Sequence, residues 1–332
     1  MNMKQSIEVF CKDLGLCTIG FIPARRFEEL KAFYEMRMYL NLQNEFEEKD
    51  IEKRLNPKYY MPEAKTIISI AFPYYHQEEQ GINGFSVYTK RLDYHQVVKK
   101  YLNQICMHIE ALGGKALSFV DSNALPERYI AYLAGNGFIG RNNMLITKQY
   151  GSYVFLGEIL TDLEISCEEK GSFELMGEYK QCGSCKICLS TCPTKAIHEA
   201  GCNPNICLSY ITQKKNITDE EIKLLKGNVF GCDFCQSKCP YNKNITTNVL
   251  EDFTTLDYMN EAIQVYAEMD NQYFKEKISK TSCGWRGKNV IRRNAMIHMA
   301  YKGQDIAYLK QDSPYINEYI ERLQKMRHIK NK

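Results

Sequence analysis

The sequence predicts a mixed helix and sheet protein, of class α+β or α/β, in three parts: residues 1–170, 171–245 and 246–332. Three observations lead to this prediction. Helical and strand-like stretches alternate as far as residue 170, which favours an α/β domain. Nine of the 14 cysteines lie between residues 182 and 239, where Pro and Gly are also frequent. After residue 246 the apolar residues return to a helical spacing.

The first part is predicted element by element from periodicity and end signals. Helices are expected over residues 3–14, 27–54, 92–112 and 127–134, and Gly15 ends the first of them. Strands are expected over residues 17–22, 66–72 and 116–120. The last two are continuous apolar runs, which are typical of buried strands. The order of the strands does not follow from the spacing.

Length and composition exclude several classes of protein. A chain of 332 residues with 44% hydrophobic residues can bury real cores, so disordered chains and small disulfide scaffolds are excluded. No apolar run reaches the ~18 residues that a membrane span needs. Residues 1–14 carry charges where a signal peptide would be apolar. We therefore expect a cytoplasmic protein with no membrane partner.

Two cysteine runs carry the clearest chemical pattern. The first, from Cys182, reads C-x2-C-x2-C-x3-C-P, and the second, from Cys232, reads C-x2-C-x3-C-P. In bacterial ferredoxins the first spacing binds [4Fe–4S] clusters, and the cysteine before proline ligates the other cluster. Zinc also binds C-x2-C pairs, but the two C-P endings and the three-residue gaps favour clusters.

Two clusters need eight thiolates, and the two runs supply seven. The eighth comes from Cys202 or Cys207, which spacing alone does not distinguish. The predicted domain over 171–245 is therefore ferredoxin-like. Its first cluster is expected on Cys182, Cys185, Cys188 and Cys239. The second is expected on Cys192, Cys232, Cys235 and the connecting cysteine.

The formal net charge of +3 hides a strong asymmetry. Residues 275–332 contain 14 Lys and Arg against 5 Asp and Glu, a net +9 that leaves −6 for the rest. Such a segment suits phosphate neutralisation by a nucleic-acid-binding protein, and a solvated helical tail is the alternative. The candidate contacts are Arg286, Lys288, Arg292 and Arg293.

Over residues 54–245 the sequence resembles the epoxyqueuosine reductase family. The matching stretches are LDYH at 92–95, DSNALPER at 121–128, GNGFIGRN at 135–142, GSYVFLGE at 151–158, the first cysteine run, CLSYIT at 207–212 and GCDFCQ at 231–236. This family is also similar to the corrinoid reductive dehalogenases. Many members continue into several helical-repeat pairs, whereas this chain has room for about one HEAT-like pair.

The resemblance implies a cobalamin-dependent reduction. Cobalamin would lie base-off between the first domain and the clusters, and electrons from a flavodoxin or ferredoxin would reach cobalt through the clusters. The substrate would be tRNA carrying epoxyqueuosine at the wobble position, and the product queuosine. The resemblance also selects Cys207 as the eighth ligand, since it stands in the family's Cys-x-x-Tyr-x-Thr context.

The resemblance assigns individual site residues. Asp121 matches the family's catalytic aspartate, for which we expect a pKa raised by burial beside the corrin face, although a helix cap is the alternative. Glu127 and Arg128 are expected to form a surface ion pair. Asp93 equally suits an N-cap, and His95 is expected to hydrogen-bond to cofactor or backbone instead of ligating cobalt. The predicted cobalamin contacts are Arg54, Asp93, Tyr94, His95, Asp121, Asn142, Asn143, Met144, Ser152, Tyr153 and Ser209.

One of these assignments and the function of the whole chain have alternatives. Arg54 equally suits a solvated charge in a Glu- and Lys-rich helix. The whole chain could instead be a corrinoid reductase acting on a small molecule, against which stand the basic C-terminal segment and the match around Asp121. It could also be a cobalamin-free electron carrier, which would leave the long first domain without a purpose.

Overall fold

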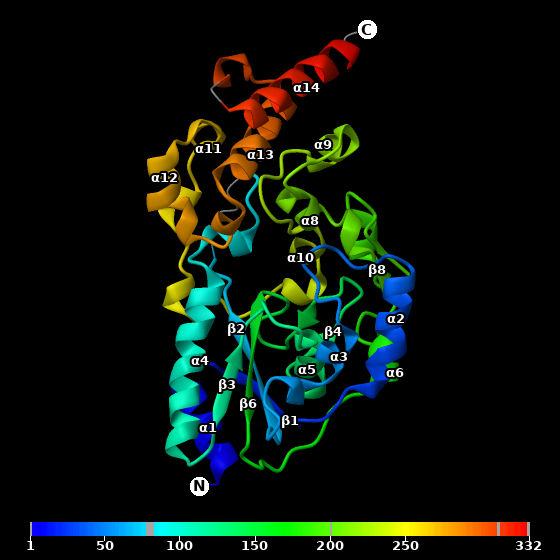
Figure 1. Ribbon diagram of the computed structural model, residues 1–332, viewed down its shortest axis with the longest axis vertical. Helices are drawn as coiled ribbons and strands as arrows, with labels where there is room; N and C mark the ends of the chain where they lie inside the picture. Colours follow the sequence, from blue (N-terminus) through cyan, green and yellow to red (C-terminus); the bar gives the residue numbers. More distant parts are fainter. Residues whose placement is uncertain (1, 78–82, 200, 311–312, 331–332) are drawn as a thin grey trace.

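A four-stranded sheet in the order β1-β2-β6-β3 lies at the centre of the N-terminal part in the computed structural model (Figure 1). The structure describes residues 2–77, 83–199, 201–310 and 313–330. Ser69 of β2 pairs with Glu158 of β6, which pairs in turn with Phe119 of β3. The strands are β1 Thr18–Pro23, β2 Thr66–Pro73, β3 Ala116–Phe119 and β6 Val154–Thr161.

Every pairing in this sheet is antiparallel, which corrects the α/β prediction and leaves the class α+β. Alternating helices and strands favour a parallel sheet, but alternation does not fix strand direction. Here β6 returns between β2 and β3, so the two strands joined through the helix at 94–111 are not neighbours. The strand at 116–120, predicted to be buried, is an edge strand in which Leu117 is 40% exposed.

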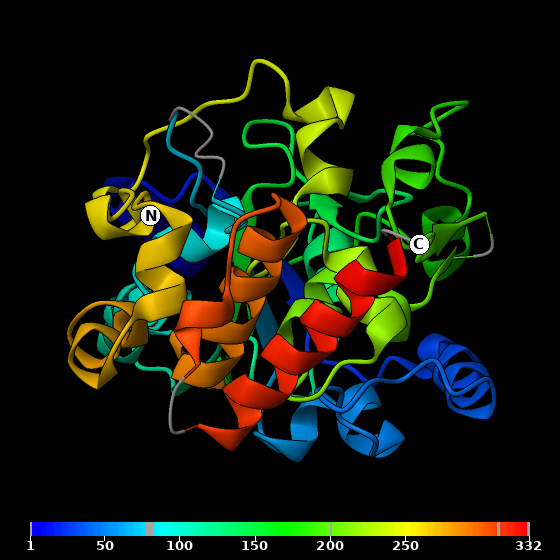
Figure 2. The same ribbon diagram turned by 90° about the horizontal axis from the view of Figure 1, so that it is seen from above.

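Helices cover both faces of the sheet (Figures 1 and 2). On one face Val98, Leu102 and Ile105 of α4 pack against Ile70 and other sheet residues. On the other face α5 packs with the short helices α2 and α3 in a second core. The helices of this part are α1 Met3–Asp13, α2 Lys31–Tyr39, α3 Ile51–Leu55, α4 Tyr94–Ala111 and α5 Glu127–Leu133.

The predicted single helix over 27–54 is wrong. After a 3-10 turn, α2 ends at Tyr39, and a loop follows in which Asn41 has a left-handed backbone (φ 51°). The side chain of Asp50 then caps α3 by accepting from the backbone N of Glu52 and Lys53. The residues between α2 and α3 have a composition typical of helices, which explains the prediction. Local hydrogen bonds from Asn and Asp side chains make this stretch a loop instead.

The cysteine-rich segment has a very small core of its own. Within the described ranges, the buried residues of that core are Cys192, Ala196 and Ile197. Its short elements are α6 Phe173–Gly177, α7 Ile187–Thr191, β7 Ile197–His198, β8 Gly201–Cys202, α8 Leu208–Gln213, α9 Asp219–Leu225 and α10 Phe234–Ser237. The hairpin of β4 Phe138–Ile139 and β5 Leu145–Ile146 precedes it.

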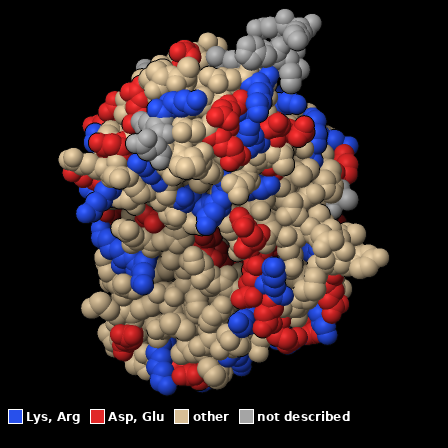
Figure 3. Space-filling model, turned by 45° about the horizontal axis from the view of Figure 1, so that its top comes forward, with Lys and Arg blue, Asp and Glu red and all other residues tan. Residues whose placement is uncertain are grey.

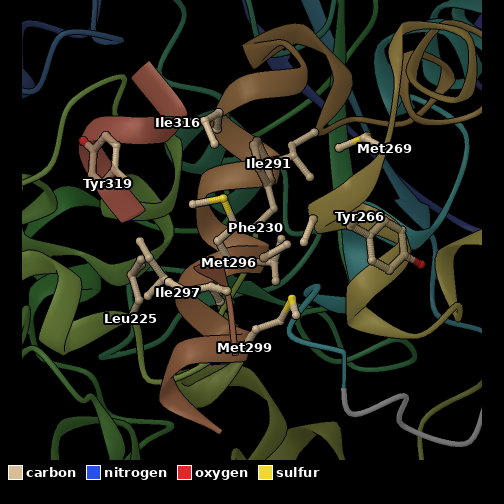
Figure 4. Packing of buried hydrophobic residues seen from close by; sticks show 14 of the residues in the cluster. Leu225, Phe230, Tyr266, Met269, Ile291, Met296, Ile297, Met299, Ile316 and Tyr319 are labelled. Carbon is tan, nitrogen blue, oxygen red and sulfur yellow. The ribbon is translucent and has the colours of Figure 1, made fainter. Parts of the chain in front are cut away.

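The C-terminal helices form a separate core around α13 (Figure 4). Ile291, Met296 and Ile297 of α13 meet Ile316 and Tyr319 of α14 in this core. Leu208, Leu225 and Phe230 belong to the same core, so its packing does not follow the boundary predicted at 245. None of the helices within the described ranges is long and apolar enough to cross a bilayer. The remaining helices are α11 Ile263–Glu268, α12 Asn271–Glu276, α13 Lys288–Tyr301 and α14 Pro314–Lys330.

Asn294 ties α13 to the cysteine-rich segment. Its fully buried side chain donates through Nδ2 to the carbonyl oxygens of Thr212 and Val229, at 2.7 Å each. Those two residues lie before and after α9, so one amide holds the chain on both sides of α9 against α13.

We expect Asn294→Ala to lower the free energy of unfolding by about 2–3 kcal/mol, because two buried carbonyl oxygens lose their donor. Denaturant titration of the anaerobically prepared protein measures this. Asn289→Ala, at an exposed position of the same helix, is the matched control and should change stability by less than about 0.5 kcal/mol. Equal effects of the two substitutions would contradict the role of Asn294.

Candidate functional site

Asp121 lies in the turn after β3, beside the first turn of α4. Its backbone is left-handed (φ 52°), which is uncommon for a residue other than glycine. The Tyr94 hydroxyl donates to Oδ2 of Asp121 at 2.7 Å, and His95 Nε2 lies 3.2 Å from the same oxygen. Asp93 caps α4, and its Oδ1 lies 2.8 Å from His95 Nδ1. The two matched stretches at 92–95 and 121–128 thus meet at one carboxylate.

This network sets the charges of the site. Hydrogen bonds to Asp121 and then Asp93 raise the pKa of His95 to about 9, so the imidazole is protonated at neutral pH. Burial alone would raise the pKa of Asp121, but hydrogen bonds from His95 and Tyr94 bring it below its usual value. Without cobalamin the proton of this network is therefore held on His95, and the raised pKa expected of Asp121 beside the corrin stays a prediction.

Glu127 does not form the expected surface ion pair with Arg128. Its Oε1 turns towards the preceding loop and accepts from the Asp121 backbone N at 2.8 Å and from Asn123 Nδ2 at 2.7 Å. Arg128 instead donates to the carbonyl oxygen of Asn143 at 2.8 Å. Burial, and then the charge of Asp121, raises the pKa of Glu127 to about 7. Sequence reasoning missed this because an Arg next to a Glu suggests local pairing.

Two predicted cobalamin contacts join the N-terminal part to the cysteine-rich segment, and a third packs within the N-terminal part. Buried Asn142 donates to the Cys235 carbonyl oxygen at 3.3 Å. Ser152 Oγ, fully buried, accepts from Gln236 Nε2 at 3.2 Å and also bonds to Asn242 Nδ2 at 2.9 Å. Buried Tyr153 stacks on another tyrosine, with ring centres 4.5 Å apart. The polar groups of Asn142 and Ser152 are thus already used between the two parts.

The other predicted contacts lie in different surroundings. Met144 is half-buried, and its backbone N donates to Asn142 Oδ1 at 3.3 Å. Half-buried Ser209 hydrogen-bonds to the Tyr88 hydroxyl. The charge of Asp121 contributes to raising the pKa of Tyr88, so the two side chains lie in the same region. Tyr88 is a site residue that sequence reasoning missed.

Arg54 is largely buried, and the contacts that hold its side chain are with Glu47 and Tyr34. Its side chain is 17% exposed and pairs with Glu47, Nη1 to Oε2, at 3.3 Å. The guanidinium also stacks over the Tyr34 ring, 4.1 Å from the ring centre. The alternative of a solvated charge is therefore wrong, because an acidic and an aromatic side chain enclose it.

The clustered cysteines form two groups of neighbouring thiols. Burial, followed by the charges of the other thiols of its group, raises the pKa of Cys188 to about 11. The first group is Cys182, Cys185, Cys188 and Cys239. The second group is Cys192, Cys207, Cys232 and Cys235. Among the residues described, three or more Cys, His, Asp or Glu nowhere gather closely enough to hold one metal ion.

Cys202 and Cys207 both lie beside the second group, but their surroundings differ. Burial raises the pKa of both thiols, that of Cys202 to about 11. The backbone N–H groups of Ser209 and Tyr210 donate to the Cys207 thiol and oppose that rise. Because such donors stabilise a thiolate, Cys207 is better prepared than Cys202 to act as a ligand.

The predicted tRNA contacts at Arg292 and Arg293 are wrong. Both residues are buried in α13. Arg292 Nε donates to the Ala267 carbonyl oxygen at 2.9 Å, and Arg293 Nη1 donates to the carbonyl oxygens of Lys214 and Lys215 at 2.9 and 2.6 Å. These guanidinium groups donate to backbone carbonyl oxygens inside the fold. The net charge of residues 275–332 is therefore larger than the positive charge on their surface.

Sequence reasoning missed an aromatic group around Trp285, which precedes α13. Trp285 (56% exposed) and Phe46 (43% exposed) lie edge to face at 5.3 Å, and Tyr210 contacts Phe46 at the same distance. The Arg286 guanidinium lies 4.7 Å from the Trp285 ring centre and pairs with Glu45 at 3.5 Å. Three separate parts of the chain supply these rings, so no local pattern predicts them.

Half-buried Lys288 opens α13 close to this group in the chain. On the face shown in Figure 3, Lys and Arg side chains gather around a hollow in the middle of the molecule, with Asp and Glu side chains beside them. Both signs of charge thus occur together on this face, although residues 275–332 alone carry a net charge of +9.

Comparison with known proteins places this geometry in a family. The family model described as epoxyqueuosine reductase QueG, DUF1730, matches residues 54–122, and the model of a 4Fe-4S double cluster binding domain matches residues 181–242. The epoxyqueuosine reductase of Lactococcus garvieae (strain Lg2) is 34% identical over 307 residues, which cover 89% of this chain and 86% of the relative. The chain belongs to the epoxyqueuosine reductase family. Its members are oxidoreductases.

Two solved structures of epoxyqueuosine reductases share the whole fold. One holds a tRNA-Tyr epoxyqueuosine-modified stem loop, with a TM-score of 0.86, 29% identity, and coverage of 97% of this chain and 90% of that one. The other, from Bacillus subtilis, has its aspartate catalytic loop swung out of the active site, with a TM-score of 0.85 and 29% identity over 96% of this chain and 88% of that one. The two-cluster domain of the family thus corresponds to the cysteine-rich segment here.

We expect the anaerobically reconstituted protein to hold about eight irons, four in each cluster. Cys207→Ser should lower this to about four, because the second cluster loses a ligand, whereas the neighbouring control Cys202→Ser should keep about eight. Iron analysis with the iron–sulfur absorbance measures both. Loss of iron in Cys202→Ser alone would make Cys202 the ligand, and a reconstituted protein with zinc alone would contradict both clusters.

Proposed function

We propose that this chain reduces epoxyqueuosine to queuosine in tRNA, with base-off cobalamin and two [4Fe–4S] clusters as cofactors. A low-potential flavodoxin or ferredoxin would supply the electrons through the clusters. One observation carries the proposal: the Asp121 carboxylate is held by Tyr94 and His95 within the chain part that matches the family. The family relatives with the same name, and the tRNA stem loop bound to one of them, support it.

The donor set around Asp121 fits a cobalamin that takes no histidine ligand. Both ring nitrogens of His95 are engaged, by Asp93 and by Asp121, so the imidazole has no nitrogen left for cobalt. Cobalamin would supply a strongly reducing cobalt centre for the two-electron step. Among the predicted contacts, Tyr94, Asn143, Met144 and Ser209 remain the candidates to hold it.

The protonation states suggest how Asp121 delivers protons. Removal of the epoxide oxygen as water takes up two electrons and two protons. Protonated His95 lies 3.2 Å from Asp121 Oδ2 and can pass its proton to that carboxylate, which would then act as the acid towards the substrate oxygen. His95 thereby reloads Asp121 after each transfer, and Asp93 holds the ring in position.

The exposed aromatic group supplies a second element of the proposal. Single-stranded RNA bases stack on aromatic rings and on Arg guanidinium planes. Trp285 and Phe46, with the Arg286 guanidinium against both rings, offer such a surface near the connecting segment of the clusters. We infer that nucleotides of the tRNA loop stack there, in place of the phosphate contacts predicted for Arg292 and Arg293.

The decisive experiment supplies the reconstituted enzyme with epoxyqueuosine tRNA and a low-potential reductant, and follows queuosine by mass spectrometry. Asp121→Asn should lower turnover by about 100-fold or more, because the acid is lost, while cobalamin and iron contents stay normal. Asp252→Asn removes a carboxylate that pairs with Lys100 and serves as the control with normal turnover. Turnover of an organohalide but not of the tRNA would instead favour the small-molecule reductase.

Trp285 is the single tryptophan of the chain, so its fluorescence reports on this surface alone. An epoxyqueuosine-modified stem loop should quench it, and Trp285→Ala should weaken binding of a labelled stem loop by about 5-fold or more, as expected for one lost stacking contact. Tyr308→Ala, at another 56% exposed aromatic, is the matched control. Unchanged affinity in Trp285→Ala would remove this surface from tRNA binding.

A further inference from the structure

Glu158 is a charged residue type at the centre of the sheet. It lies in the middle of β6, is 0% exposed, and has Ser69 of β2 and Phe119 of β3 as its cross-strand partners. Besides the second carboxyl that approaches it, the polar side chain that faces its carboxyl group is the small hydroxyl of Ser69. An ionised carboxylate in such a place is very unfavourable, so Glu158 is held in its neutral, protonated form.

The neighbour of Glu158 is the Glu127 carboxyl. Burial, followed by the charge of Glu127, raises the pKa of Glu158 well above its usual value, and the two carboxyls are close enough to hydrogen-bond. Two ionised carboxylates have no proton to place between them, so this contact becomes a hydrogen bond only when one of them is protonated. Glu158 is therefore the donor and Glu127 the acceptor.

Glu127 in turn holds the turn that carries Asp121. Its Oε1 accepts from the Asp121 backbone N and from Asn123 Nδ2, at 2.8 and 2.7 Å. The left-handed backbone of Asp121 costs free energy, and persists only where surrounding contacts impose it. The hydrogen bond from the Asp121 N to Glu127 is such a contact. Glu127 in turn contacts Glu158 of the central strand β6.

We propose that Glu127 is a positioning residue for the reduction, which fixes the Asp121 turn to β6 through a proton shared with neutral Glu158. The proposal rests on the function proposed above, since it concerns the placement of the Asp121 carboxylate. The proton of the pair stays in place during turnover, and the protons delivered to substrate come from the His95 side.

The pair has a cost that depends on pH. The groups that face Glu127 are Asp121 from the turn, Arg128 from its own helix and Glu158 from β6, while Glu158 faces Glu127 and uncharged Ser69. The pKa of Glu127 is raised to about 7 in the fold, against 4.5 for a free carboxyl. An acid with a raised pKa destabilises the fold as pH rises through this window, and above about pH 7 the whole penalty is present.

Glu127→Gln and Glu158→Gln should therefore raise the thermal unfolding midpoint relative to the wild type at pH 8 but not at pH 5. Both variants keep an oxygen and a hydrogen-bond donor in place, so turnover should stay within about threefold of the wild type. Glu127→Ala removes the acceptor and should lower turnover at least tenfold. In hydrogen exchange, the amide of Asp121 should exchange faster in Glu127→Ala than in the wild type. In the two Gln variants it should exchange at the wild-type rate.

These measurements separate positioning from other roles. Loss of turnover in Glu127→Gln and Glu158→Gln equal to that in Glu127→Ala would overturn the proposal in favour of a proton relay. Unchanged Asp121 amide exchange in Glu127→Ala would also overturn it. Normal iron content and a cooperative melt in Glu127→Ala exclude general misfolding. The exchange experiment needs no substrate, so it decides the proposal even if the wild type fails to produce queuosine.

Discussion

The fold depends on a constraint in its least regular part: each group of four thiols takes cysteines from both runs. Cys239 of the second run lies with the first run, and Cys192 of the first run lies with the second. Residues 193–231 must therefore close a loop between the runs. The cysteine-rich segment has only a small hydrophobic core of its own, so packing against neighbours such as α13 stabilises it. Bound iron–sulfur clusters would add to this stabilisation.

The same closure brings the site together. The connecting loop carries Cys207 and Ser209, and Ser209 meets Tyr88, whose surroundings include Asp121. Asn142 and Ser152 bind residues beside the second run, which fixes the β4–β5 hairpin and the start of β6 against the thiols. The cysteine-rich segment is therefore linked to the surroundings of Asp121 through Ser209 and Tyr88.

The sequence predicted the features that depend on local pattern. The helices at 3–14, 92–112 and 127–134 are present within a few residues, as are the strands at 17–22 and 66–72, because periodicity and caps such as Asp93 are local. Strand direction, the break after Tyr39 and the burial of Arg292 and Arg293 depend on partners distant in the chain. The pKa of Asp121 depends on His95, 26 residues away, so no local argument gives its direction.

Arg293 and Glu158 are both fully buried charged residues, but their partners differ in kind. Arg293 is fully buried, but its Nε and Nη1 find Asn294 and two backbone carbonyls, so the guanidinium stabilises the junction of α13 with the connecting segment. Glu158 is as deeply buried, but its carboxyl meets a second carboxyl, that of Glu127, and the hydroxyl of Ser69 instead of an opposite charge. Hydrophobic residues of similar size would stabilise the central strand better than a carboxyl that has to keep its proton. Since Glu158 approaches Glu127, which holds the Asp121 turn, a role in placing Asp121 accounts for this unfavourable group better than the stability of the sheet does.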